Sequence, residues 1–187
     1  MKTSKELIME ALDNMLKTSK PNELGKLFAK PAEIYGRDWI NENTSVKCYD
    51  RPDNGKENNQ GGYDLLTEFG LRVQVKLRSR TLHLENTRRN SAKNEGAASK
   101  SGHVAYSDDE FDVVVFVRPG SWNETKPNDW EDSSKWELLA IPVDQLKDDT
   151  NPGFIMRSVP TCIMKKFRGK TVEILEKLEK QRIRSAA

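Results

Sequence analysis

The segment 61–78, GGYDLLTEFGLRVQVKLR, constrains the fold of this chain most, because it has the pattern of a β-hairpin. Side chains alternate in character along two short runs, as they do in strands that bury one face. Between the runs lie Glu68, Phe69 and Gly70, which we predict to form the turn. A three-residue hairpin loop places its last residue in the left-handed region, where glycine is favoured.

The length of this turn determines which residues pair across the hairpin. A three-residue turn pairs Asp64 with Gln74, and paired side chains point to the same face with β-carbons roughly 5 Å apart. Lys76 shares that face, because it lies two residues beyond Gln74. A two-residue turn would separate these polar residues from one another. The register that gathers them also turns an apolar set toward the core: Tyr63, Leu65, Val73, Val75 and Leu77.

Asp64, Gln74 and Lys76 have side chains that can act together on a phosphate. A carboxylate and an amide carbonyl are hard oxygen donors, which suit Mg²⁺ or Mn²⁺. An adjacent ammonium group can position water and offset charge on a phosphate oxygen. The alternative interpretation is a surface hairpin with a solvated polar face, and the pattern alone leaves both open.

Asp64 followed by Gln74-Val75-Lys76 resembles the PD-(D/E)xK nuclease motif in its QxK form. That form occurs in some type II restriction endonucleases and in some intron-encoded homing endonucleases. Tyr63 stands where the family usually has proline, and Gln74 stands where it more often has an acid. The resemblance covers roughly residues 23–146. It implies a mixed α/β (α+β) fold, with a restriction-endonuclease-like central mixed β-sheet flanked by helices.

The same resemblance implies roles for the motif residues in Mg²⁺-dependent hydrolysis of DNA phosphodiester bonds, with Mn²⁺ as an alternative metal. Asp64 and Gln74 would bind the metal through side-chain oxygens, and Val75 through its backbone carbonyl. Lys76 would hold the attacking water and stabilise charge on the phosphate. The product would carry a 5′-phosphate.

A helix before the hairpin often supplies a further acid to the site in the resembled family. We predict helices over 4–18 and 23–40 from their apolar spacing, with a kink or break in the second at Pro31. Glu33, just past that proline, is the candidate acid, with Asp38 behind it. The alternative for Glu33 is an exposed helical acid without a role in the site.

The most basic part of the chain is the segment 79–102, which directly follows the motif lysine and which we expect to be a loop or a loosely held helix. Basic groups there can contact phosphates and make binding salt-dependent, and arginine can also read guanine. A solvated loop is the alternative. The DNA-binding candidates are Arg78, Arg80, His83, Arg88, Arg89 and Lys93.

Length and composition agree with one intracellular domain. The 187 residues carry a formal net charge of only +2, so any basic surface must come from local clustering. Cys48 and Cys162 lie far apart, and no secretory leader or long apolar run is present. We therefore expect a single nuclease domain over 1–187 with reduced thiols, without a membrane segment, and cytoplasmic if prokaryotic.

The rest of the chain shows a clear strand at 110–118, EFDVVVFVR, whose continuous apolar run predicts burial on both faces. Trp122 and Trp130 are expected to pack over the sheet or to stack on bases. Further predicted elements are strands at 45–49 and 136–141, a helical turn at 142–146, an edge strand within 154–164 and a helix over 170–184.

These patterns favour an endonuclease that acts on double-stranded DNA, most simply a type II restriction endonuclease. A homodimer would suit a palindromic site by symmetry. A homing, repair or junction-resolving nuclease is possible on the same fold, and so is a catalytically inactive DNA-binding module or an interaction protein.

Overall fold

The computed structural model describes residues 12–14, 16–17, 24, 27–51, 62–78, 82–86, 104–123 and 129–186. Its helices are α3 (Ala29–Asn43), α4 (Thr161–Phe167) and α5 (Thr171–Ala186), and its 3-10 turns are η2 (Ser133–Lys135) and η3 (Val143–Gln145). Its strands are β1 (Cys48–Asp50), β2 (Leu65–Thr67), β3 (Arg72–Leu77), β4 (Glu85–Asn86), β5 (Val104–Ala105), β6 (Val113–Arg118) and β7 (Glu137–Pro142).

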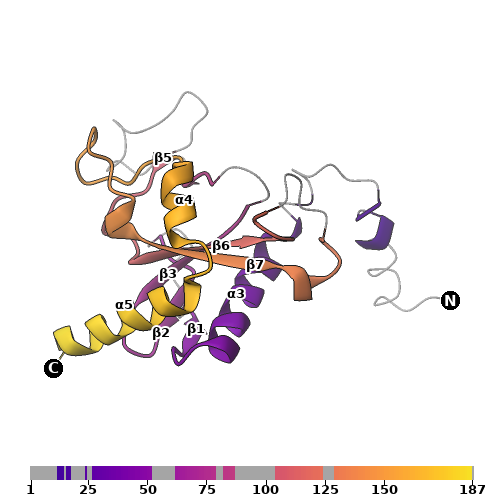
Figure 1. Cartoon of the computed structure of the whole chain (residues 1–187), viewed down its shortest axis with the longest axis horizontal. Coiled ribbons are helices and arrows are strands. Elements are labelled where there is room, and N and C mark those ends of the chain that lie inside the picture. The colour runs from indigo at the N-terminus through magenta and orange to yellow at the C-terminus, as the bar shows by residue number, and fades with distance from the viewer. Residues whose placement is uncertain are drawn as a thin grey trace.

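Five strands form one mixed sheet in the order β1-β2-β3-β6-β7 (Figure 1). Neighbours are antiparallel except β3 and β6, which run parallel. Two parallel strands must be joined by a long connection. The connection between β3 and β6 contains β4 and β5, which pair with each other. Helix α3 packs on β3, whereas α4 and α5 pack on β7; in Figure 1, α3 and α5 lie below β6 and β7 and α4 lies above them. The predicted mixed α/β fold, with a central sheet flanked by helices, is confirmed.

The hairpin formed by β2 and β3 has the predicted turn and register. Leu65 pairs with Val73, and the Thr67 N–H donates to the Leu71 carbonyl at 3.0 Å. Gly70 has a φ of +84°, in the left-handed region that the last residue of such a turn requires. The three-residue turn is therefore confirmed, and with it the pairing that places Asp64 opposite Gln74.

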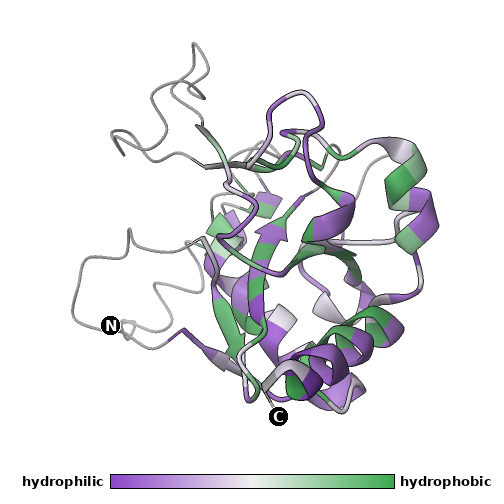
Figure 2. Cartoon of the chain, turned by 90° about the vertical axis from the view of Figure 1, so that its left-hand side faces the viewer, coloured by the Kyte–Doolittle hydropathy of each residue, from purple (hydrophilic) through white to green (hydrophobic). Residues whose placement is uncertain are grey.

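Strand β6 forms the centre of the core, and all six of its residues are buried. Its neighbours β3 and β7 contribute Val73, Leu139 and Ile141, which have no exposed surface. Figure 2 shows hydrophobic residues gathered on the strands, whereas α5 carries both hydrophobic and hydrophilic residues around its surface. The burial of β6 on both faces confirms the interpretation of its continuous apolar run.

Several predicted elements are wrong or shifted, because contacts between distant segments override local pattern. The segment 154–164 is not an edge strand: it makes isolated bridges at Phe154, Ile155 and Ser158, and α4 begins at Thr161. Residues 85–86 form β4 where a loop or loosely held helix was predicted, because β5 pairs with them. The strand predicted at 45–49 is β1, which begins at Cys48.

The predicted helices also differ in detail from those observed. The interruption expected at Pro31 falls at Phe28, and Pro31 lies in the first turn of α3, where a backbone N–H has no helical acceptor to lose. Of the helix predicted over 4–18, residues 12–14, 16 and 17 are helical, and the others lie outside the described residues. No described helix is both long and apolar enough to span a membrane.

Helix α5 buries one face against β7. Leu175 on this face has no exposed surface. The Thr171 hydroxyl is also buried there and donates to the Leu138 carbonyl of β7 at 2.9 Å. Val172 and Ile183 lie away from this face and are 38% and 39% exposed.

Of the two expectations for the tryptophans, packing within the protein is the one observed, and the cysteines are as expected. Trp122 and Trp130 are 7% and 8% exposed, so they pack in the protein and do not offer their faces to bases. Cys48 is buried and Cys162 is exposed, and both are free thiols, as predicted.

Candidate active site

The hairpin register brings Asp64 beside the start of β3. Asp64 lies one residue before β2, and its N–H donates to the Val73 carbonyl at 2.9 Å. Its carboxylate oxygen Oδ2 accepts a hydrogen bond from the Val75 N–H at 2.8 Å and another from Gln74 Nε2. The carboxylate is therefore held against the strand that carries the other two motif residues.

Burial distinguishes this group from an ordinary surface hairpin. Gln74 is only 3% exposed, and Asp64 and Lys76 are half-buried. The interpretation as a hairpin with a solvated polar face is therefore wrong. The structure covers the Gln74 side chain almost completely, whereas Asp64 and Lys76 keep part of their surface exposed.

The amide of Gln74 lies between two oxygen atoms. Its Nε2 donates to Asp64 Oδ2 and also to the Val75 carbonyl oxygen, at 3.1 Å. A half-turn of the amide about its last bond would place Oε1 where Nε2 now lies. Three oxygens would then converge, from a carboxylate, a side-chain amide and a backbone carbonyl. This donor set fits a hard divalent cation such as Mg²⁺ or Mn²⁺.

A metal at this position would depend on the amide and backbone oxygens. Within the described ranges, no group of three or more His, Cys, Asp or Glu side chains is arranged to hold a metal ion.

Burial raises the pKa of Asp64 to about 6. Removal of the carboxylate from water is the largest cause, and the negative charge of Glu33 raises the pKa further. The positive charges of Lys76 and Lys30 and the hydrogen bond from Val75 lower it. Glu33 and Lys30, both on α3, thus act on the motif carboxylate through their charges.

The first turns of α3 thus bring Glu33 toward Asp64, together with a lysine that the sequence did not identify. Lys30 Nζ lies 2.7 Å from Glu33 Oε2, one helical turn away. The hydrogen bond to Glu33 raises the pKa of Lys30, and the charges of Glu33, Asp50 and Asp64 raise it further. The spacing of Lys30 and Glu33, three residues apart on a predicted helix, is the sequence signal for this pair. Asp38 pairs instead with Arg37 at 2.8 Å.

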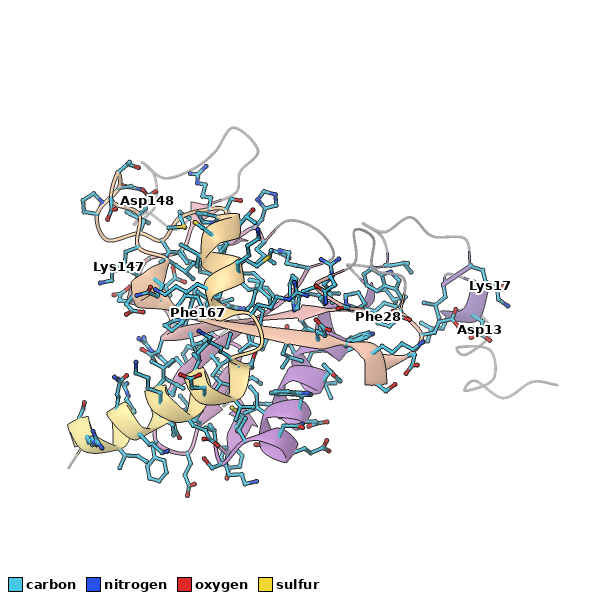
Figure 3. The ribbon with its side chains drawn as sticks, viewed as in Figure 1. Asp13, Lys17, Phe28, Lys147, Asp148 and Phe167 are labelled. Carbon is cyan, nitrogen blue, oxygen red and sulfur yellow. The ribbon has the colours of Figure 1, made fainter. Side chains whose placement is uncertain are left out.

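Aromatic packing fixes the start of α3 relative to the sheet. The ring of Phe28 lies 5.4 Å from that of Trp130 and 5.9 Å from that of Trp136, and Figure 3 shows Phe28 beside the strands where α3 begins. Two turns further on, the Tyr35 hydroxyl donates to the Trp136 carbonyl at 3.0 Å. These contacts position Lys30 and Glu33 from outside the hairpin.

Tyr106, which the motif did not predict, lies beside Lys76. The Lys76 Nζ lies 5.1 Å from the centroid of the Tyr106 ring, in a cation–π arrangement. Tyr106 directly follows β5, which lies between β3 and β6 in the chain. The sequence places a tyrosine before β6 but carries no signal that it reaches Lys76.

The predicted DNA-binding residues are only partly within the described residues. The Arg78 guanidinium donates to the His83 carbonyl at 3.0 and 2.7 Å and to the Leu77 carbonyl at 2.9 Å. His83 is exposed and forms a bridge with Ser158. Arg80, Arg88, Arg89 and Lys93 lie outside the described residues.

Comparison with protein-family models, curated proteins and solved structures finds no match to this chain.

Proposed function

We propose that this protein is a metal-dependent endonuclease that hydrolyses phosphodiester bonds of double-stranded DNA, with type II restriction as its role. One observation carries the proposal. The Gln74 amide lies between Asp64 Oδ2 and the Val75 carbonyl oxygen, the atoms that the nuclease resemblance assigns to a metal, with Lys76 two residues along the same strand.

The order of the elements supports the proposal. The resemblance implies a motif hairpin followed by a central strand, and β6 follows β2 and β3 and pairs with β3 in parallel. It also implies an acid from a preceding helix, and Glu33 of α3 lies within electrostatic reach of Asp64. The fold class by itself does not specify a nuclease, because many activities share mixed α/β folds.

Each residue of the group has a separate task in this proposal. Bound Mg²⁺ would polarise a phosphoryl oxygen and stabilise charge on the leaving oxygen. Asp64, Gln74 and the Val75 carbonyl would provide its protein ligands, and the Asp64 carboxyl must lose its proton to do so. Lys76 would orient the attacking water and offset charge that develops on the phosphate. Glu33 would hold a second metal or the water bound to it, once released from Lys30.

Plasmid cleavage tests the proposal directly. Supercoiled DNA is incubated with wild-type protein and Mg²⁺, in parallel with the Asp64→Asn and Lys76→Ala variants. Lys180→Ala, which changes an exposed lysine of α5, is the matched control. We expect nicked or linear DNA from the wild type and the control, and at least a hundredfold slower cleavage from the two site variants.

Other results would reject the proposal and favour a different function. Salt-sensitive retention of DNA without cutting in Mg²⁺ or Mn²⁺ would indicate a binding module, and neither cutting nor retention would favour an interaction protein. Among cutting enzymes, discrete fragments from a short palindromic site, together with a homodimer in sedimentation, support restriction. Cleavage at a long asymmetric site would indicate a homing enzyme, whereas a preference for damaged or branched DNA would indicate repair or junction resolution.

A further inference from the structure

Tyr106 and Lys76 come from different parts of the fold and meet beside the motif. Lys76 belongs to β3, whereas Tyr106 follows β5 in the connection that leads to β6. The lysine Nζ lies 5.1 Å from the centre of the tyrosine ring. At this separation the negative face of the ring attracts the ammonium group.

The tyrosine ring is a fixed surface. Tyr106 is 3% exposed, and its ring lies edge-on to that of Phe111, with centroids 5.2 Å apart and an interplanar angle of 79°. Phe111 is itself only 1% exposed. The backbone is fixed as well, because the Tyr106 carbonyl accepts a hydrogen bond from the Ile155 N–H at 3.0 Å.

Lys76 needs such a surface because its side chain is long and flexible. The charge of Asp64 attracts the ammonium group, and Lys76 in turn lowers the pKa of Asp64. Attraction to a carboxylate alone would draw Nζ toward the metal ligands. The ring face provides a second attraction that arises from another element, and a group held from two sides keeps a defined position.

We propose that Tyr106 is a positioning residue for Lys76: its ring face holds the end of the lysine side chain and aims Nζ at the reacting phosphate. The role of Lys76 in catalysis rests on the proposed nuclease function, whereas the contact between ring and ammonium does not.

The contact between Lys76 and the Tyr106 ring can be detected by an experiment that does not require DNA cleavage. Reductive methylation with ¹³C-formaldehyde labels lysines as dimethylamines and keeps their positive charge. Methyl groups over a ring face resonate upfield of those on exposed lysines. Lys166 Nζ also lies 5.1 Å from a ring centroid, that of Phe167, so the signal of Lys76 is identified as the upfield signal that is absent from Lys76→Arg. We expect this signal in the wild type, retained in Tyr106→Phe and moved to the chemical shift of exposed lysines in Tyr106→Leu. If the wild-type signal of Lys76 has the chemical shift of an exposed lysine, the proposal is overturned, whether or not Tyr106→Leu folds.

Kinetics then test the positioning role. Tyr106→Phe keeps the ring and is expected to retain kcat, whereas Tyr106→Leu is expected to lower kcat roughly tenfold with little change in KM for DNA. Introduced into the Lys76→Ala background, Tyr106→Leu should cause no further loss. The positioning role is overturned if Tyr106→Phe and Tyr106→Leu lower kcat equally. It is also overturned if Tyr106→Leu lowers kcat in the Lys76→Ala background as much as it does in the wild type. Failure of every variant and the wild type to cut DNA, with the upfield signal present, rejects the nuclease function and leaves the contact established.

Discussion

Glu179 of α5 accepts a hydrogen bond from the Thr67 hydroxyl at 2.8 Å, although the two residues are 112 positions apart. The same Thr67 oxygen accepts the Leu71 N–H across the hairpin turn at 2.8 Å. The Phe69 N–H points at the other Glu179 oxygen, at 3.4 Å. The C-terminal helix therefore holds the turn whose length determines the register of the motif.

Glu179→Ala is expected to lower the free energy of unfolding by about 1–3 kcal/mol, because the buried Thr67 hydroxyl loses its acceptor. Urea denaturation monitored by tryptophan fluorescence measures the change. Glu173→Ala, at an exposed position on the same helix, is the control and should change the stability by less than about 0.5 kcal/mol. Similar losses in the two variants would show that the Thr67 contact contributes little.

Asp64→Asn is expected to stabilise the metal-free protein at neutral pH. The folded protein binds the Asp64 proton more tightly than the unfolded chain, because its pKa is raised to about 6. Stability therefore falls as pH rises from about 4 to about 6, and the charged carboxylate costs roughly 2–3 kcal/mol above that range. Asparagine has no such charge and retains an oxygen that can accept the Val75 N–H.

Urea denaturation of EDTA-treated protein at pH 4 and pH 7.5 tests whether the charge on Asp64 lowers the free energy of unfolding. The variant should be more stable than the wild type at pH 7.5, and the difference should nearly vanish at pH 4. Asp144→Asn, an exposed change in η3, should show no such pH dependence. A variant less stable than wild type at pH 7.5 would contradict the expected cost of the buried charge.

Gln74→Glu is expected to change metal binding and stability in opposite directions. A second carboxylate beside Asp64 raises affinity for Mg²⁺ or Mn²⁺, because it adds a charged oxygen ligand. Without metal, the two like charges repel and Tm falls. A cation that binds only the folded state stabilises it by about 2.7 kcal/mol at a hundred times its Kd.

Thermal unfolding with EDTA and with increasing Mn²⁺ measures both effects. Gln145→Glu, which adds the same charge in η3 away from the motif, is the control. We expect the Mn²⁺-dependent rise in Tm to be larger for Gln74→Glu than for wild type, and to be absent from Asp64→Asn. An equal rise in all four proteins would indicate binding elsewhere.

Gly62→Ala is expected to disturb Asp64 from a distance of two residues. A β-carbon on Gly62 would lie 2.7 Å from the Glu110 β-carbon, far inside van der Waals contact, so the chain before Asp64 must shift. We expect cleavage to slow at least tenfold, because small displacements of a site are costly. Cleavage assays and near-UV circular dichroism separate this local effect from unfolding.

The control for this glycine is Gly153→Ala. That position has a φ of +86° and open space around it, so the substitution strains the backbone without a steric clash. It should lower stability while leaving cleavage of DNA close to the wild-type rate. Retention of full activity in Gly62→Ala would show that the contact with Glu110 does not control the position of Asp64.

Local pattern predicted the hairpin correctly because the interactions that define it are local. Gly70 adopts the left-handed conformation that a three-residue turn requires, and alternation then allows only one register that buries Val73. The continuous apolar run of β6 likewise predicted a strand that is covered on both faces, as observed. Local pattern failed at 154–164, where Ile155 is buried through bridges to other loops and not within a strand of its own.

The amino-acid sequence by itself determined the hairpin and its register, and it placed Asp64, Gln74 and Lys76 on one face, since turn length and side-chain alternation act over a few residues. Only the tertiary structure decided that Gln74 is buried, that α3 brings Lys30 and Glu33 to the group, and that the Tyr106 ring lies against Lys76. These features depend on contacts between segments far apart in the chain, and close packing of the whole protein selects them.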